Sequence, residues 1–370
     1  MSRGTCAVID LSALRHNYQL IKQRAPHSQI LAVVKADGYG HGLSSIARAL
    51  NESDGFGVAI LEEALLLRAA GITQKIVMLE GALSIEELRQ ASESRVDVVV
   101  HQLEQVAEIE LAGTKVFLNV WLKIDTGMHR LGVDPADAEE AYLRLSACAG
   151  VEHITLMSHF SSADDADERV SREQYALFEQ LKARLLRADP QNTFLPASLA
   201  NSAGIFQHAD FHYDWVRPGV ALYGGSPAEQ RKASEFGLRP VMTLMSRVLS
   251  LRLIARGECV GYGASWTANK DTLVAIVAIG YGDGYPRHMN DDACVLVGGT
   301  YCSVIGRVSM DMIAVNVSAL QNVAINDPVI LWGEGLPVEM AAEWADTINY
   351  ELLCQVTDRV DHRYVGLEEE

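Results

Sequence analysis

The segment with the sequence VVKADGYGHG, residues 33–42, places a lysine where a short apolar run gives way to glycines. The amine of a lysine that is shielded from water has a lowered pKa and can form a Schiff base with an aldehyde. Tyr39 follows Lys35 by four residues, within reach of the same edge. A lysine that points into solvent is the plain alternative, and the glycine spacing matches neither a Walker loop nor a dinucleotide fingerprint.

Two more polar segments follow apolar runs. In residues 121–132, Lys123 and Asp125 alternate with apolar residues, and Arg130 then offers a planar fork suited to a carboxylate. His159 comes directly after the run 151–157. A surface loop with an ion pair and a structural histidine are the alternatives here.

Asn201, Ser202 and Arg217 lie in the last two segments of this kind, residues 199–204 and 216–224. Asn201 and Ser202 are residue types that cap a helix, and the free N–H groups at a helix start attract phosphate. A simple cap and a surface arginine are the alternatives. These side chains can form one site only if the strands that precede them end at the same edge of a sheet or barrel.

The first part of the chain supplies such elements. Apolar runs alternate with helical patterns such as 61–70, 102–112 and 171–187. Continuous rather than alternating hydrophobicity indicates parallel strands buried on both faces. Eight strand–helix units in this length predict a (β/α)8 barrel of the TIM type, whose active sites lie at the C-terminal ends of the strands. An open doubly wound sheet is the alternative. The eight runs are 29–34, 55–60, 75–79, 96–100, 115–122, 151–157, 193–198 and 212–216.

The pattern of apolar and polar residues changes near residue 235. Runs such as 241–254, 272–279, 301–308 and 328–332 are separated by Gly, Asp and Asn, which indicates a mainly antiparallel β domain. One helix is predicted over 338–348. We expect a barrel over residues 10–235 and a β domain over 236–370, with residues 1–9 adding a strand to the latter.

Composition excludes several classes of protein. Hydrophobic residues make up 49% of the 370 residues, which argues against disorder, and the net charge of −17 argues against a nucleic-acid-binding face. No apolar run reaches the roughly 20 residues of a membrane helix. The six cysteines show neither paired nor zinc-ligand spacing, so we expect no metal site. The N-terminus lacks a secretory pattern, and a reduced, cytoplasmic protein is expected.

Three loops of the second part complete the pattern: VGYGASW at 260–266, IGYGDGYPR at 279–287 and GRVSMDM at 306–312. Together with VVKADGYGHG, LKIDTGMHRLG and VRPGVALYG they resemble the alanine racemases, in order and over nearly the whole chain. The resemblance implies a homodimer that uses pyridoxal 5'-phosphate to interconvert L- and D-alanine, for peptidoglycan synthesis or alanine catabolism.

The resemblance also implies roles for single residues. Lys35 resembles the Schiff-base lysine and the base on the D-alanine face, and Tyr262 resembles the opposing base, from the other subunit. Arg217 resembles the partner of the pyridine nitrogen, His159 a residue hydrogen-bonded to it, and Arg130 the ligand of the phenolic oxygen near the substrate carboxylate. The phosphate cradle corresponds to Tyr39, Ser202, Gly219, Val220 and Tyr350, with Asn201 beside it.

The remaining implied roles concern the substrate. The backbone of Met310 and Asp311 resembles the part that meets the substrate carboxylate. Tyr281, Arg287 and Arg307 resemble residues of the channel through which substrate enters. Lys123 resembles a lysine that is often carbamylated and then holds Arg130.

Several alternatives stay open at this point. A racemase for serine, lysine or a broader set of amino acids would share the same motifs. A non-catalytic cofactor-binding protein would end near residue 235, and a basic amino-acid decarboxylase would carry other motifs. An acidic interaction protein would not bind the cofactor.

Overall fold

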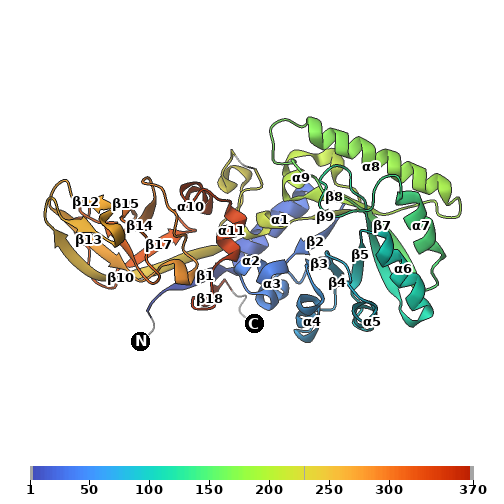
Figure 1. Cartoon of the computed structure of the whole chain (residues 1–370), viewed down its shortest axis with the longest axis horizontal. Helices are drawn as coiled ribbons and strands as arrows, with labels where there is room; N and C mark the ends of the chain where they lie inside the picture. Colours follow the sequence, from blue (N-terminus) through green and yellow to red (C-terminus); the bar gives the residue numbers. More distant parts are fainter. Residues whose placement is uncertain (1–2, 229, 367–370) are drawn as a thin grey trace.

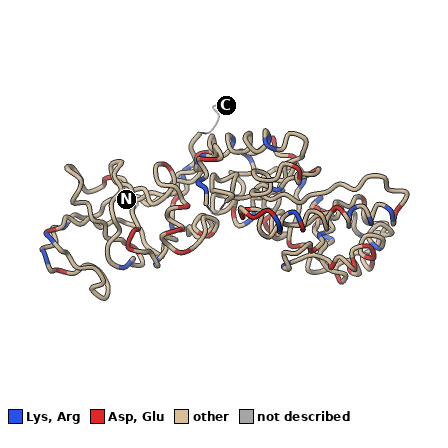
Figure 2. The backbone as a smooth tube through the Cα atoms, turned by 90° about the horizontal axis from the view of Figure 1, so that it is seen from above, with Lys and Arg blue, Asp and Glu red and all other residues tan. Residues whose placement is uncertain are grey.

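The computed structural model describes residues 3–228 and 230–366. The acidic tail Glu368–Glu370 lies outside the described residues. A barrel and a β domain lie end to end, with α10 (Val338–Trp344) and α11 (Asn349–Cys354) between them (Figure 1). Seen from above, acidic and basic residues are interspersed along both parts (Figure 2). Among the described residues, no helix is both long enough and apolar enough to cross a membrane.

The predicted barrel is confirmed, because eight parallel strands close when Ile30 of the first pairs with Val216 of the last. The strands are β2 (Gln29–Val33), β3 (Gly55–Val58), β4 (Lys75–Met78), β5 (Asp97–Val100), β6 (Leu118–Lys123), β7 (Val151–Met157), β8 (Ala197–Asn201) and β9 (Trp215–Arg217).

Burial on both faces explains the continuous apolar runs. Every residue of β3, β4 and β5 is buried except the half-buried first residue of β4. One face of the strands packs on the helices, while the other forms a separate enclosed cluster: Leu31, Val77, Val99, Trp121, Met157 and Trp215. The rings of Trp121 and Trp215 meet edge to face there, with centroids 5.5 Å apart.

The helices around the barrel bury one face each. In α8 (Arg169–Ala188), the buried residues recur at helical spacing: Ser171, Gln174, Phe178, Leu181 and Leu185. The side chain of Asp10 caps α1 (Leu11–Arg24) by accepting from two backbone N–H groups. The others are α3 (Leu43–Ala49), α4 (Leu61–Ala69), α5 (Ile85–Glu93), α6 (Leu103–Ala112), α7 (Ala138–Ala147) and α9 (Ser202–Gln207).

The predicted antiparallel domain is also confirmed. The described strands form an eight-stranded sheet in the order β13-β16-β15-β14-β17-β10-β1-β18, and β13 also pairs with β10. Their bounds are β1 (Cys6–Asp10), β10 (Met242–Ile254), β13 (Thr272–Val277), β14 (Cys294–Val297), β15 (Thr300–Ile305), β16 (Ile313–Asn316), β17 (Pro328–Trp332) and β18 (Asp361–Val365). A small hairpin, β11 (Cys259–Val260) with β12 (Trp266–Thr267), lies apart from it.

Both ends of the chain enter this sheet. β1 pairs antiparallel with β10 and parallel with β18, so the first strand joins residues more than 200 positions away. Only the β1–β18 pairing departs from the antiparallel pattern.

Two boundary predictions were wrong. The strand expected at 193–198 is β8, which begins at Ala197, because Pro196 has no N–H to donate and the strand continues to Asn201. The helix expected over 338–348 is α10, which already ends at Trp344, because Asp346 adopts a φ of 53° that a right-handed helix does not accept. The next helix, α11, begins at Asn349, was not predicted, and carries Tyr350.

Candidate active site

The chain turns left-handed directly after Lys35. The next four residues, Ala36, Asp37, Gly38 and Tyr39, have φ between 52° and 62°. Only glycine adopts this conformation freely, and other residues lose about 1–2 kcal/mol each. Backbone strain of this kind persists only where surrounding contacts hold it, and it is concentrated at functional sites.

Two carboxylates hold the turn. The side chain of Asp37 accepts a hydrogen bond from the N–H of Leu43 at 2.7 Å, and that of Glu63 accepts from the N–H of Ala36 at 2.7 Å. The turn leaves Lys35 half-buried at the end of β2 and buries Tyr39. The strain therefore fixes where both side chains lie.

Tyr39 packs against other aromatic rings. It stacks on Tyr223 with centroids 4.8 Å apart and lies 6.2 Å from the ring of Tyr350. Burial raises the pKa of Tyr39, and it raises the pKa of Tyr350 to about 12. Both hydroxyls are therefore neutral hydrogen-bond donors at neutral pH.

The Tyr39 hydroxyl meets the start of the loop after β9. A Cβ atom on Gly219 would lie 2.5 Å from this hydroxyl, so only glycine fits there. The hydroxyl of Ser202 accepts from the N–H of Gly219 at 2.9 Å and, more weakly, from that of Ala221 at 3.4 Å. Val220 lies between them, so the predicted cradle residues of this loop are gathered beside Tyr39 and Ser202.

Asn201 ends β8 and begins α9. Its side chain accepts from the N–H of Gly204 at 3.0 Å, which makes it the N-cap that its residue type predicts.

Arg217 ends β9 and is buried, with 3% of its surface exposed. Its guanidinium donates to the Ser198 hydroxyl at 2.6 Å and to the Ser158 carbonyl at 2.6 Å. Burial lowers its pKa to about 9, so the group still carries its charge at neutral pH.

His159 contacts Arg217 through its Nδ1 atom, 3.1 Å from the guanidinium. A guanidinium can only donate, so Nδ1 accepts and the ring proton lies on Nε2. Burial, followed by the charge of Arg217, holds the pKa of His159 well below its usual range. The ring is therefore neutral.

Lys123 ends β6 and is also buried. Burial lowers its pKa to about 8, and the neighbouring charges of Arg217, Arg130 and Lys35 act in the same direction. Four cations thus converge on the mouth of the barrel. Among residues 3–228 and 230–366, no carboxylate lies within ion-pair distance of any of the four.

This donor set fits an anionic cofactor such as a phosphorylated pyridine aldehyde. The uncompensated cations favour negative charge, and the hydroxyls of Tyr39 and Ser202 both lie against Gly219, where a side chain would clash with Tyr39.

The other predicted residues lie together on the β domain. Tyr262 begins the turn η5 (Tyr262–Ala264) and is 71% exposed. The Arg307 side chain packs against this turn, 3.0 Å from the position of a Cβ on Gly263. Tyr281 and Met310 are exposed and belong to adjoining segments, since the N–H of Tyr281 donates to the Ser309 carbonyl at 3.1 Å.

Arg287, which is exposed, and Asp311, which is half-buried, belong to the same domain. β12, which follows Tyr262 in the chain, lies at the far end of this domain from α2 (Lys35–Gly40) (Figure 1). One chain therefore does not bring Tyr262 to Lys35.

Some residues of the site were missed by sequence reasoning. Ser198 lies inside β8, where nothing in the sequence marks it. Tyr223 lies in a quoted motif, but only the fold shows that its hydroxyl donates to the Val33 carbonyl at 3.0 Å. Glu63, in the first turn of α4, is marked only by its position after a barrel strand.

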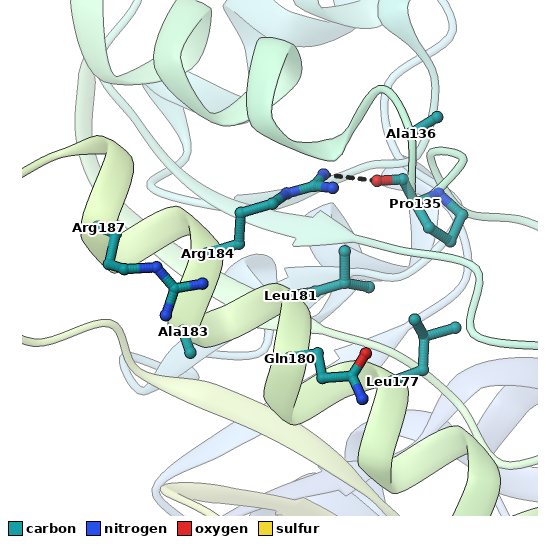
Figure 3. Close-up of a pocket in the computed structure, with 8 residues that line it drawn as sticks. All are labelled: Pro135, Ala136, Leu177, Gln180, Leu181, Ala183, Arg184 and Arg187. Atoms are coloured by element: carbon teal, nitrogen blue, oxygen red, sulfur yellow. Dashed lines mark hydrogen bonds between the residues drawn. The ribbon is translucent and has the colours of Figure 1, made fainter.

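A surface cavity of about 540 Å³ lies elsewhere, against the outer face of α8 (Figure 3). Arg184 crosses it and donates to the Pro135 carbonyl at 2.6 Å. It contains none of the predicted site residues.

Comparison with known proteins agrees with this arrangement. The family model for the N-terminal domain of alanine racemase matches residues 9–227, and that for the C-terminal domain matches residues 241–364. The chain is 45% identical to the biosynthetic alanine racemase of Escherichia coli K12, over 98% of this chain and 99% of the relative. It is 43% identical to an alanine racemase of Yersinia pestis, with the same coverage.

Solved structures give the same result. The biosynthetic alanine racemase of Pseudomonas aeruginosa superposes with a TM-score of 0.93 at 44% identity, covering 99% of this chain and all of that one. The enzyme of Acinetobacter baumannii superposes with a TM-score of 0.92 at 38% identity, covering 98% of this chain and 99% of that one. The chain belongs to the alanine racemase family.

Proposed function

We propose that this protein interconverts L-alanine and D-alanine with pyridoxal 5'-phosphate. The observation that carries the proposal is the convergence of four cations and a neutral His159 at the barrel mouth, next to a cradle of donors, in a chain of this family. When bound, the cofactor withdraws electrons from the α-carbon of an amino acid and weakens its C–H bond.

Each barrel residue then has a task. The Lys35 amine attaches the cofactor. The hydroxyls of Tyr39, Ser202 and Tyr350 and the N–H groups of Gly219 and Val220 hold its phosphate, and Asn201 fixes the helix start beside them. Arg130 binds the phenolic oxygen near the substrate carboxylate.

Racemisation needs proton transfer on both faces of the α-carbon. The Lys35 amine acts on the D-alanine face, and the Tyr262 hydroxyl of a second copy acts on the L-alanine face. The exposure of Tyr262 supports a homodimer with shared sites. Its β domain (236–370, with 1–9) would complete the barrel (10–235) of the other copy.

Arg217 limits side reactions in this proposal. A guanidinium keeps its proton, so Arg217 would donate a hydrogen bond to the pyridine nitrogen of a bound cofactor and would not protonate it. Electron withdrawal is then moderate, which favours simple proton return over transamination.

We also propose that Lys123 becomes carbamylated. Its buried amine has a pKa of about 8, and the resulting negative charge would hold Arg130 and offset part of the local positive charge. The substrate would reach this site past Tyr281, Arg287 and Arg307, with its carboxylate against the Met310–Asp311 backbone.

The test is chiral analysis of L-alanine after incubation with the purified protein and pyridoxal phosphate, beside L-serine and L-lysine. Rapid D-alanine formation, approaching an equal mixture and outpacing the other two, is the expected result. Faster conversion of serine or lysine would keep the two bases but change the substrate. No conversion of any amino acid by protein with bound cofactor would contradict the proposal.

A supply of D-alanine for peptidoglycan, in the cytoplasm, is the role that we propose. The relatives named as biosynthetic support this over alanine catabolism.

A further inference from the structure

A buried carboxylate in the β domain joins four segments that are far apart in the sequence. Asp283 ends the turn η6 (Tyr281–Asp283) and is 1% exposed. Its oxygens accept from the N–H of Gly280 at 3.0 Å and from the guanidinium of Arg3 at 3.1 and 3.3 Å. The guanidinium of Arg359 lies 3.4 Å from the Asp283 carboxylate.

The same two arginines reach the loop 309–312. Arg3 donates to the backbone carbonyl of Asp311 at 2.5 Å, and Arg359 donates to the Asp311 carboxylate at 2.7 Å. Each arginine therefore spans from the buried Asp283 to this loop. The chain before β1 and the chain before β18 both contribute to its position.

The turn and the loop are also in direct contact. The N–H of Gly282 donates to the Met310 carbonyl at 2.9 Å. A Cβ on Gly280 would lie 2.2 Å from the Ser309 carbonyl, so the two backbones pack too closely for a side chain at this position. On the outer side, Met310 is 52% exposed and Tyr281 is also exposed.

A buried carboxylate with two arginines is an expensive way to stabilise a turn, because desolvation offsets most of the attraction between the charges. Its advantage is a single geometry, since each guanidinium is a rigid fork with fixed donor directions. Neither arginine nor Asp283 touches the barrel mouth of its own chain. Their effect must pass through the loop that they hold.

We propose that Asp283, Arg3 and Arg359 are positioning residues that fix the Met310–Asp311 backbone and Tyr281 for use by the active site of a second copy of this chain. This inference rests on the proposed function and its shared sites. It identifies the internal support of the loop that meets the substrate carboxylate. A loosened loop should weaken substrate binding in the other subunit and leave the cofactor in its own subunit undisturbed.

The first test is Asp283→Asn, which keeps the shape of the side chain and removes its charge. We expect KM for alanine to rise roughly tenfold with a much smaller change in kcat, because a small misplacement of a binding group is costly. Arg359→Lys is a second, partly exposed variant that keeps the charge but loses the fork, and KM should rise in it as well. Arg363→Lys is the matched control, because Arg363 pairs at the surface with Asp361 and KM should not change.

The decisive test assigns the effect to a subunit with tagged heterodimers in which one subunit carries Lys35→Ala. In the first arrangement, Asp283→Asn and Lys35→Ala are on different subunits, so the one working site receives a normal loop. In the second, both changes are on one subunit and its wild-type partner depends on the altered loop. We expect a normal KM in the first and a raised KM in the second.

A raised KM in the first arrangement, or the same KM in both, would overturn the inference, because a general loss of structure does not follow the loop across the interface. Loss of the lysine-bound cofactor absorbance in Asp283→Asn or Arg359→Lys would also overturn it. Failure of the proposed function is distinguishable, because the wild-type homodimer would then not racemise alanine at all.

Discussion

At the scale of single residues, the barrel mouth depends on charges without carboxylate partners. Among the residues that the structure describes, Arg217 donates to the Ser198 hydroxyl, to backbone carbonyls and to the ring of His159, and to no carboxylate. Because no carboxylate neutralises it, the positive charge of Arg217 can act on a ligand bound in the site. His159 lies beside it and is neutral, so it orients the guanidinium without adding charge.

Arg217→Glu reverses this charge and allows the pyridine nitrogen to be protonated. We expect slower racemisation by roughly tenfold or more, since the Ser158 and Leu199 carbonyls lose their donor, and a rise in transamination per turnover. The measurement is pyruvate released per alanine racemised. Arg217→Lys, which keeps the charge, is the control, and no increase in pyruvate with the glutamate would count against the role given to Arg217.

Lys123 gives a prediction about pH. Only a neutral amine attacks carbon dioxide, and an ordinary lysine is almost fully protonated below pH 10. The pKa of about 8 means that the neutral fraction rises through pH 7–9. At a fixed pressure of labelled carbon dioxide, we expect the carbamate signal in carbon NMR to increase through this window. A signal that survives in Lys123→Met would show that another amine carries it.

At the scale of elements, the site is the junction between a strained turn and the loop after β9. The α2 turn is braced from the β domain of its own chain. A Cβ on Gly40 would lie 2.2 Å from the Leu353 carbonyl of α11, and the ring of His362 contacts the Gly40 carbonyl at 2.9 Å. The fit between elements, rather than any one side chain, sets the position of Tyr39.

Gly219→Ala tests this junction. The added methyl group must displace the Tyr39 hydroxyl, and overpacking of this kind costs about 1–3 kcal/mol. If this cost falls on the cofactor-bound state, we expect roughly 5- to 150-fold weaker cofactor binding. Titration of the apoprotein with pyridoxal phosphate measures the effect. The same substitution in a Tyr39→Phe background should cost less, because the clashing hydroxyl is gone. If Gly219→Ala weakened cofactor binding equally in both backgrounds, the clash would not involve the Tyr39 hydroxyl.

At the scale of the whole molecule, the chain holds two half-sites that it cannot join by itself. Lys35 lies at the barrel mouth, and Tyr262 is exposed in the turn just before β12, the strand at the far end of the β domain (Figure 1). The β domain thus has two uses: α11 and β18 brace the barrel of the same chain, while Tyr262 and Tyr281 are exposed.

Mixing Lys35→Ala protein with Tyr262→Phe protein tests the shared site. Each homodimer should be nearly inactive, whereas a heterodimer holds one site with both bases, so up to about half of the wild-type activity per heterodimer should return. Activity that stays absent after exchange of subunits has been demonstrated by native mass spectrometry would rule out the shared site.

The sequence alone determined the elements and the residue types. The barrel follows from eight continuous apolar runs, and Lys35, Lys123, His159 and Arg217 could be selected because each ends or follows a strand. Local patterns are sufficient for these predictions, because a strand that is buried on both faces, and the point where it ends, can be recognised from residues that are adjacent in the sequence.

Only the tertiary structure decided the left-handed turn after Lys35, the fit of Gly219 to Tyr39, and the cluster around Asp283. It also revealed α11, which was not predicted and which places Tyr350 beside Tyr39. These features depend on contacts between segments as far as 308 residues apart, such as Arg3 with Asp283 and Asp311, and on backbone angles that residue types permit but do not require. Such contacts leave no local periodicity in a single sequence.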